Sequence, residues 1–166
     1  MSDGWHYATT SGAEVRGWLN DRGTWYYLDS ETGQMKTGRH QVGSVFYLFD
    51  GSGAMRTGWV EMSDGWHYAT TSGAEVRGWL SDRGAWYYLD PATGQMATDQ
   101  KQVGNETYFF KASGAMWTGW QKRADGWHFL NSNGTETRGW VASGKKWYYL
   151  DPATGIMATG ERTIGG

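Results

Sequence analysis

Paired aromatic side chains recur along this chain at intervals that could build binding sites. Trp18 and Trp25 lie seven positions apart, and the same pair returns further along the chain as Trp79 and Trp86. The face of an indole ring attracts cations, and the same ring can also stack against a sugar or be buried as core packing. The chemistry that these residues offer is therefore recognition by ring faces rather than the making and breaking of bonds.

A second recurring feature pairs a histidine with a glutamate. It occurs in three copies: His6 with Glu14, His67 with Glu75, and His128 with Glu136. A metal site needs three or four converging ligands, and each copy offers a single His. Catalysis needs one water-excluded constellation rather than a motif repeated at intervals. We therefore expect no catalytic residue, no metal ligand, no cofactor and no enzyme activity, and we interpret the His as a strand residue with a polar tip.

The composition excludes several classes of partner. The 166 residues include 15 Lys and Arg against 17 Asp and Glu, a net charge of −2. A nucleic-acid or anionic-membrane binder would show a basic excess, and no apolar run is long enough for membrane insertion. Without Cys, a disulfide framework is impossible. Aliphatic residues are few beside 12 Trp and 10 Tyr, so Trp and Tyr are expected to form the core.

The chain is a tandem repeat, because the segment 1–16 recurs letter for letter at 62–77. Inside this long period lies a shorter one, about a third of its length. These shorter units follow a partial unit at 1–16 and precede another at 160–166, and they begin at Gly17, Gly38, Gly58, Gly78, Asp99, Gly119 and Gly139. We expect residues 1–166 to form a single repeat domain.

Each unit is predicted to be a β-hairpin that needs neighbours. A Gly-Trp pair opens the unit, an Asp- or Gly-bearing turn follows, and an aromatic segment such as 25–29 forms the second strand. Both faces of that strand are apolar, so stacked neighbours must cover them. The fold class is therefore all-β, a β-solenoid of stacked β-hairpins. Because a Trp-His-aromatic unit returns every third hairpin, we infer about three hairpins per superhelical turn.

The unit pattern GW-x6-WYYLD-x3-G-x-M-x-TG, complete at 17–38, resembles the cell-wall-binding repeats of choline-binding proteins. Related families are the glucan-binding repeats of glucansucrases and the repeats of clostridial toxins. The resemblance implies a left-handed superhelix with ligand pockets between consecutive hairpins. It also implies a secreted, non-catalytic module of the cell wall or cell surface, with a possible homodimer through terminal hairpins.

In the family that the chain resembles, a pocket is lined by two Trp of one unit, an aromatic residue of the next, and often a Met. Two junctions fit best: Trp59 and Trp66 with Trp86, and Trp120 and Trp127 with Trp147. Further candidates are Trp18 and Trp25 closed by Tyr47, Trp79 and Trp86 closed by Tyr108, and Trp140 with Trp147 in the last full unit.

The resemblance leaves two ligands in competition. A quaternary ammonium donates no hydrogen bonds and is held by ring faces, each contact contributing about 0.5–2 kcal/mol. Weak sites of this kind suit choline-bearing teichoic acid, because linking them raises avidity by roughly 10²–10⁴. The alternative is an α-glucan, favoured by the Trp-poor segment 41–50. A structural spacer, in which every Trp is part of the core, is a third possibility. Glu75 and Arg77 depart from the family pattern, and we expect them to form an exposed ion pair that contributes little.

Overall fold

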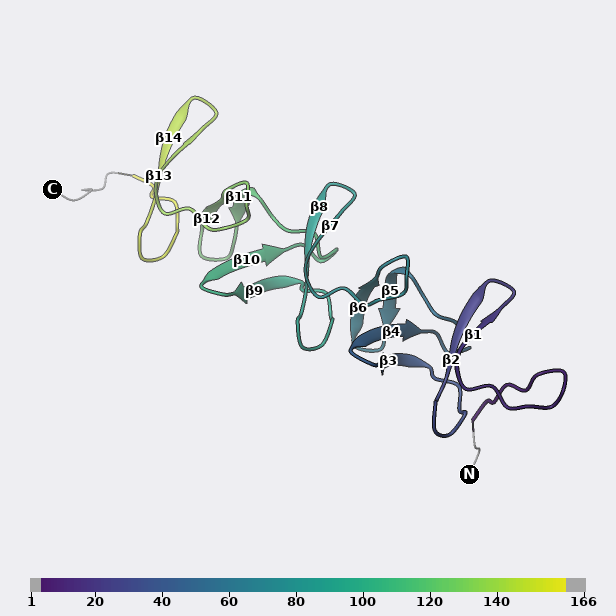
Figure 1. Ribbon diagram of the computed structural model, residues 1–166. Coiled ribbons are helices and arrows are strands. Elements are labelled where there is room, and N and C mark those ends of the chain that lie inside the picture. The colour runs from purple at the N-terminus through teal and green to yellow at the C-terminus, as the bar shows by residue number, and fades with distance from the viewer. Residues whose placement is uncertain (1–3, 161–166) are drawn as a thin grey trace. The chain divides into compact units, whose positions relative to one another are not determined.

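The computed structural model describes residues 4–160, and within them the chain is built from β-hairpins alone (Figure 1). Consecutive strands pair antiparallel as separate two-stranded sheets. The strands are β1 (Gly17–Asp21), β2 (Thr24–Leu28), β3 (Gly38–Val42), β4 (Val45–Phe49), β5 (Gly58–Met62), β6 (Gly65–Ala69), β7 (Gly78–Asp82), β8 (Ala85–Leu89), β9 (Asp99–Val103), β10 (Glu106–Phe110), β11 (Gly119–Lys122), β12 (Trp127–Leu130), β13 (Gly139–Ser143) and β14 (Lys146–Leu150). Each predicted unit start coincides with the first residue of a strand, so the all-β fold and the hairpin assignment are confirmed.

The chain divides into two compact units. One contains the residues up to Leu80 together with Leu89–Met96, and the other contains Ser81–Tyr88 and the residues from Ala97 onwards. The division falls within the β7–β8 hairpin, at the middle of the repeat array.

Turn chemistry explains the hairpins. Between β1 and β2 both central residues, Arg22 and Gly23, have positive φ, which is the two-residue turn that matches the twist of paired strands. After each second strand the chain reverses, and at Asp90 the reversal is an Asx turn. The Asp90 carboxylate accepts hydrogen bonds from the backbone N–H groups of Ala92 and Thr93, at 2.9 and 3.1 Å. The Asp-Pro-Ala-Thr-Gly segment is thus a turn.

The core is a row of side chains at one repeated position rather than a mass of indoles. The last residue of the second strand is at most 3% exposed in every described hairpin: Leu28, Phe49, Ala69, Leu89, Phe110, Leu130 and Leu150. Strand tryptophans, by contrast, remain 41–44% exposed at Trp25, Trp66 and Trp127. The expectation that Trp and Tyr form the core was therefore wrong for these strand Trp, because the buried position at the end of each second strand carries Leu, Phe or Ala.

Backbone hydrogen bonds join neighbouring hairpins. The N–H of Met55 donates to the carbonyl of Trp25 at 2.7 Å, and the N–H of Glu75 donates to that of Phe46 at 2.8 Å. The following unit in turn packs on Met55. Gly73 lies so close to the sulfur of Met55 that a β-carbon at this position would overlap it. Such nearest-neighbour contacts are what a solenoid of stacked hairpins requires.

The left-handed winding stays a prediction of the family resemblance, and about three hairpins per turn stays a prediction of the repeat pattern. Of the predicted partial units, residues 1–3 and everything beyond 160 lie outside the described residues. The described residues contain no helix of the length and apolarity that crossing a membrane requires.

Candidate ligand-binding site

An aromatic slot lies between the β1–β2 hairpin and the β3–β4 hairpin. Its cavity measures about 280 Å³, far more than a single water molecule needs. The lining residues are Trp18, Trp25, Tyr47, Met55 and Ser72. The slot therefore has three aromatic walls, a thioether and a hydroxyl, and no side chain with a formal charge.

The rings of this slot stand at steep angles to one another. The centroids of Trp18 and Trp25 are 6.2 Å apart with 84° between the ring planes, and those of Trp18 and Tyr47 are 4.7 Å apart at 72°. All three rings line the cavity, and edge-to-face pairing is a preferred arrangement of aromatic side chains. Trp18 and Trp25 are 36% and 44% exposed, so part of the surface of each residue is accessible to a ligand.

Four backbone positions, which we call opening, strand, closing and loop, define such a slot. The opening position is the second residue of the first strand, Trp18 in this slot, and the strand position is Trp25, the second residue of the second strand. The closing position is the third residue of the next hairpin's second strand, Tyr47. The loop position is Met55, whose N–H bonds the carbonyl of the strand residue.

Strand alternation explains why the closing residue is not the next hairpin's own Trp. Successive side chains of a strand point to opposite faces. The strand position therefore faces the following hairpin, while the closing position, one residue later, faces the preceding hairpin. A single strand can in this way serve two slots, one on each side.

The same arrangement occurs near the other end of the array, around Trp120. The ring of Tyr148, at the closing position, lies 4.7 Å from that of Trp120 at 67°. The indole N–H of Trp120 donates to the hydroxyl of Ser143 at 3.1 Å, and Met157 bonds the carbonyl of Trp127 at 2.7 Å. The aromatic residue that the structure brings against Trp120 is thus Tyr148, the residue after Trp147. Sequence reasoning missed Tyr148, although strand alternation and its alignment with Tyr47 were signals for it.

Other predicted site residues have less complete surroundings. Trp140 and Trp147 are 57% and 70% exposed, and residues 161–166, the end of the next partial unit, lie outside the described residues. Trp59 and Trp66 belong to one compact unit, and Trp86 belongs to the other. Trp79 and Tyr108 are divided between the two units in the same way. Their junctions stay predictions.

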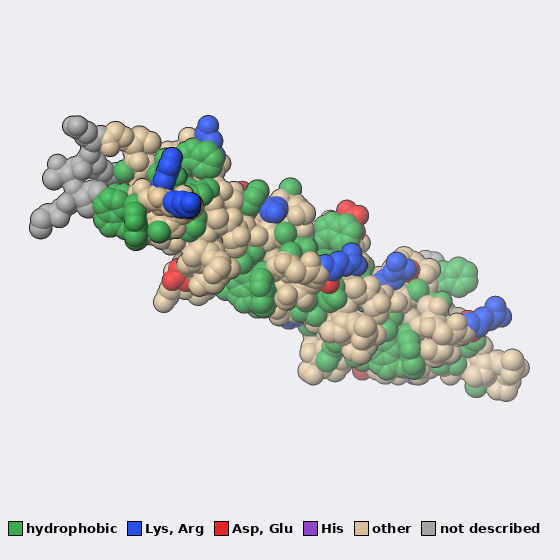
Figure 2. All heavy atoms as spheres, turned by 90° about the horizontal axis from the view of Figure 1, so that it is seen from above, with side chains coloured by type: hydrophobic (Ala, Val, Ile, Leu, Met, Phe, Trp, Pro, Cys, Tyr) green, Lys and Arg blue, Asp and Glu red, His purple; other side chains and the backbone are tan. Residues whose placement is uncertain are grey.

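Two further cavities border tryptophans. One cavity of about 380 Å³ is lined by Trp5, Tyr26 and Met35 among others. The N–H of Met35 donates to the carbonyl of Trp5 at 2.7 Å, so these residues match the strand, closing and loop positions of a slot that has no opening Trp. The second is a groove of about 650 Å³ beside Trp59 and Trp66. On the face drawn in Figure 2, apolar side chains lie at the surface beside Lys and Arg.

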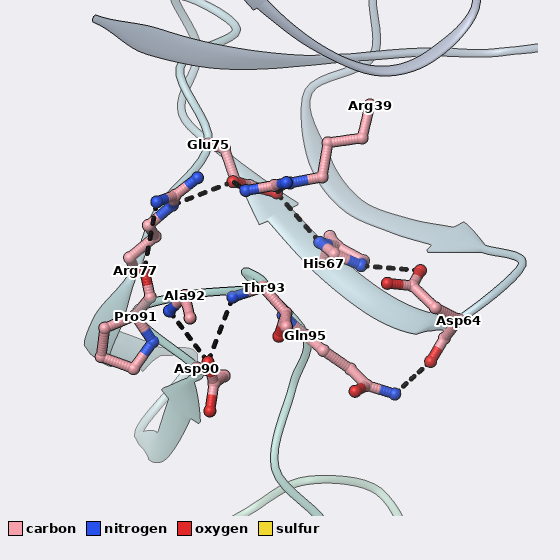
Figure 3. A network of polar contacts seen from close by, with 10 residues as sticks. All are labelled: Arg39, Asp64, His67, Glu75, Arg77, Asp90, Pro91, Ala92, Thr93 and Gln95. Atoms are coloured by element: carbon pink, nitrogen blue, oxygen red, sulfur yellow. Dashed lines mark hydrogen bonds and ion pairs between the residues drawn. The ribbon is translucent and has the colours of Figure 1, made fainter.

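The next junction, between the β3–β4 and β5–β6 hairpins, is polar at three of the four positions (Figure 3). Arg39 stands at the opening position, Phe46 at the strand position, His67 at the closing position and Glu75 at the loop position. Arg39 donates from Nε and Nη2 to the two oxygens of Glu75, at 2.7 and 2.9 Å. The side chains of His67 and Glu75 are completely buried, so the expected exposed pair at Glu75 was wrong.

Hydrogen bonds fix the charges of this junction. His67 contacts Glu75 through Nδ1 and Asp64 through Nε2, each at 3.0 Å, and Arg77 donates to Glu75 at 3.1 Å. Burial alone would raise the pKa of Glu75, but the hydrogen bonds from His67 and Arg39 lower that pKa to about 2. Burial alone would lower the pKa of His67, yet its two carboxylate partners raise it. The junction therefore holds an ionised carboxylate among cationic groups.

Comparison with known proteins agrees with this architecture. Residues 56–100 and 117–161 match the family model of the choline-binding repeat, and residues 17–35 and 101–116 match that of a putative cell wall binding repeat. No curated protein is a significant match.

Three solved structures illustrate the similarity. Choline-binding protein F from Streptococcus pneumoniae is 34% identical over 95% of this chain and 57% of its own, with a TM-score of 0.84. The modular autolysin LytC from Streptococcus pneumoniae is 28% identical over 95% of this chain and 37% of its own, with a TM-score of 0.69. The pneumococcal cell wall endolysin of phage Cp-1, complexed with choline, is 27% identical over 87% and 41%, with a TM-score of 0.50.

Fold and slots together define a class: an all-β solenoid of stacked hairpins with aromatic slots between neighbours. The chain belongs to the choline-binding repeat family. It spans 57% of choline-binding protein F and smaller shares of the other two structures.

Proposed function

We propose that this chain is a non-catalytic attachment module that binds the choline groups of cell-wall teichoic acid. The observation that carries the proposal is the open slot formed by Trp18, Trp25, Tyr47 and Met55. The family of the chain and the choline complex of the Cp-1 endolysin support it. Its partner would then be a polymer outside the cell, with the module secreted and held at the wall or surface.

The lining of the slot suits a quaternary ammonium group. Such a group carries a positive charge spread over methyl groups and has no hydrogen to donate, so it gains little from hydrogen-bond acceptors. Ring faces attract it by about 0.5–2 kcal/mol each, depending on how dry the contact is. Three rings and a polarizable thioether, with no acidic side chain, would give a weak single site. A polymer bearing many cholines converts weak sites into firm attachment by avidity.

Choline titration followed by the indole N–H signals of the tryptophans tests this proposal. We expect the signals of Trp18 and Trp25 to shift at millimolar choline, and the shift at Trp25 to need a higher choline concentration in Trp18→Ala, because one ring contact is lost. The matched control is Trp117→Ala, an exposed indole that stacks with Lys111 and is absent from the slot lining. No response at tens of millimolar choline would overturn the proposal.

Carbohydrate binding is the second candidate, favoured by the groove of about 650 Å³. There Trp59 and Trp66 lie with Asp50, Arg56 and Glu61, groups that could exchange hydrogen bonds with sugar hydroxyls. An α-glucan ligand predicts retardation in gels containing dextran, unaffected by choline and lost in Trp66→Ala. Equal mobility with and without dextran would exclude it.

Self-association through a terminal hairpin also stays a proposal. The strongly exposed Trp147 at the β13–β14 hairpin would be a contact residue. Sedimentation at several protein concentrations, with Trp147→Ala as the variant, distinguishes a dimer from a monomer.

A further inference from the structure

We infer that the junction between β3–β4 and β5–β6 is closed to choline because the chain places its own cation there: the guanidinium of Arg39 occupies the position that a ligand ammonium takes in an open slot. The inference rests on the proposed function. It assigns to Arg39, and to Arg123 in the other compact unit, the role of deciding which junctions take a ligand.

The geometry at Arg39 reproduces the features of a bound cation. Its guanidinium carbon lies 3.8 Å from the ring centroid of Phe46, the residue at the strand position. In the open slot the same backbone position carries Trp25, whose ring is a wall for the ligand. The cation of the chain thus stands over the equivalent aromatic wall, within the range of a cation–π contact.

The closed junction differs from an open slot in having an anion. Glu75 replaces Met at the loop position, and both of its oxygens bind Arg39 in the two-pronged geometry that makes such pairs strong. His67 and Arg77 hold the same carboxylate, and Asp64 holds His67 from the far side. At the exposed edge of the junction, Gln95 donates a hydrogen bond to the carbonyl of Asp64 (Figure 3).

A choline would have to displace this guanidinium and leave Glu75 without its two-pronged partner. Choline could not replace it, because it offers methyl groups where the carboxylate needs N–H donors. Removing one partner of a buried ion pair is strongly unfavourable. The internal cation therefore excludes the external one.

The same solution appears independently in the other compact unit, with a different arginine. At the junction between β9–β10 and β11–β12 the opening and strand positions are Gln100 and Thr107, neither of which is cationic or aromatic. Here Arg123, from the turn after β11, places its guanidinium carbon 3.4 Å from the ring centroid of Phe109. It donates to Glu136 at 3.2 Å.

Glu136 is held by a histidine as Glu75 is. His128 lies 2.8 Å from Glu136 and, through its other nitrogen, 3.1 Å from Asp125. Two arginines from unrelated places in the repeat thus reach a phenyl ring and a histidine-bound glutamate. At both junctions the chain therefore supplies its own cation, although the arginine and the ring come from different positions.

The first arm of the test is a reporter variant. Phe46→Trp puts an indole under Arg39 while leaving the ion pair with Glu75 intact. During choline titration we expect no shift of the indole N–H at position 46, while Trp18 and Trp25 respond in the same sample. The Nε–H signal of Arg39 and, in the unmodified protein, the ring signals of Phe46 and Phe109 should also stay unchanged at choline concentrations that saturate Trp18.

The second arm opens the slot. The five changes Arg39→Trp, Phe46→Trp, His67→Tyr, Glu75→Met and Arg77→Thr copy the residues of the open slot. They remove Arg39 and also Arg77, whose guanidinium carbon lies 4.2 Å from the ring centroid of Phe46. We expect the indoles at positions 39 and 46 to respond to choline within about threefold of the concentration that half-saturates Trp18. If the five substitutions together prevent folding, the reporter variant Phe46→Trp still tests the inference.

The outcomes separate the two proposals. A choline response at position 46 of the reporter, together with a response at Trp18, overturns the closed junction and leaves the proposed function standing. The inference is also overturned if the variant with five substitutions folds and responds at Trp18 but shows no response at positions 39 and 46. Silence at Trp18 and Trp25 in every protein overturns the proposed function, and this inference with it.

Discussion

Two neighbouring junctions of this chain use the same four backbone positions in opposite ways. Between β1–β2 and β3–β4 the positions carry Trp18, Trp25, Tyr47 and Met55, and a cavity remains. One hairpin later, three of the four positions are charged or polar, and a network of ion pairs fills the space around Glu75. The backbone connection is the same in both, with the loop-position N–H bonded to the strand-position carbonyl at 2.7 and 2.8 Å.

The difference teaches that stability and recognition are divided among the junctions. A slot that keeps its ring faces open gives up buried contacts, because exposed indole surface contributes nothing to the hydrophobic stabilisation. A closed junction buries a carboxylate and a histidine that hold neighbouring hairpins together through directed hydrogen bonds. We therefore expect substitutions at closed junctions to affect the fold and substitutions at open slots to affect binding.

The largest effect is expected from Glu75→Ala. This change leaves Arg39, Arg77 and His67 without their shared carboxylate, and loss of one partner from a buried pair destabilises by about 3–5 kcal/mol. The free energy of unfolding from urea denaturation measures it. Glu14→Ala is the matched control, because Glu14 bonds His6 in the same way but is 40% exposed. A loss in Glu75→Ala no larger than in Glu14→Ala would contradict a structural role for the closed junction.

A smaller effect is expected from Gly73→Ala, because Gly73 packs against Met55, one of the residues that line the open slot. The new β-carbon would overlap the sulfur of Met55. The left-handed backbone at this glycine by itself costs an L-residue about 1–2 kcal/mol. We expect a lower free energy of unfolding and weaker choline binding at Trp25. Gly12→Ala is matched to it, with a φ of 82° and nothing within 4 Å of the new atom. If both variants weaken choline binding equally, the contact with Met55 is not what supports the slot.

Removal of one slot wall should change binding and leave the fold nearly intact. In Trp25→Ala the slot loses one ring contact, about 0.5–2 kcal/mol, which corresponds to a roughly 2- to 30-fold weaker affinity at that slot. The indole N–H of Trp18 reports it during choline titration. Phe46→Ala, at the equivalent position of the closed junction, should leave the Trp18 titration unchanged. An equal loss of affinity in both variants would erase the distinction between the junctions.

The smallest expected effect is a difference in pH response. Because the pKa of His67 is raised, its contribution to stability is complete below the ordinary His value of 6.5 and is lost as the pH rises through the raised pKa. The pKa of Glu75 is lowered to about 2, so its contribution is complete above 4.5 and is lost as the pH falls toward 2. We expect unfolding free energy to be highest between these limits.

The same pH series separates the junctions, because the groups around His67 are Glu75, Asp64, Arg39 and Arg77, whereas the open slot is lined by no carboxylate or histidine. Choline affinity at Trp18 should therefore stay constant from pH 5 to 8. In His67→Asn the decline of stability on the alkaline side should become shallower. An unchanged alkaline decline would assign it to other groups.

Much of the architecture could be predicted from the repeat alone. Hairpin boundaries follow from Gly-Trp openings and Asp- or Gly-bearing turns, which act over a few residues and so are visible in the sequence. The set of Trp18 and Trp25 with Tyr47 came from the family resemblance rather than from the repeat itself, and these three residues line one cavity. The core could not be predicted in the same way. The composition favoured a core of Trp and Tyr, but the most deeply buried side chains are Leu28 and the other residues at the last position of each second strand.

The sequence by itself determined the hairpins, their repetition and the supply of ring faces, since each depends on residues close together in the chain. Only the tertiary structure decided which faces stay open. Arg39 and Glu75 are 36 residues apart, and their ion pair exists because stacking places the loop of one unit over the strand of another. Likewise Tyr148 rather than its neighbour Trp147 meets Trp120, because strand alternation and stacking together set which side of a hairpin each ring occupies.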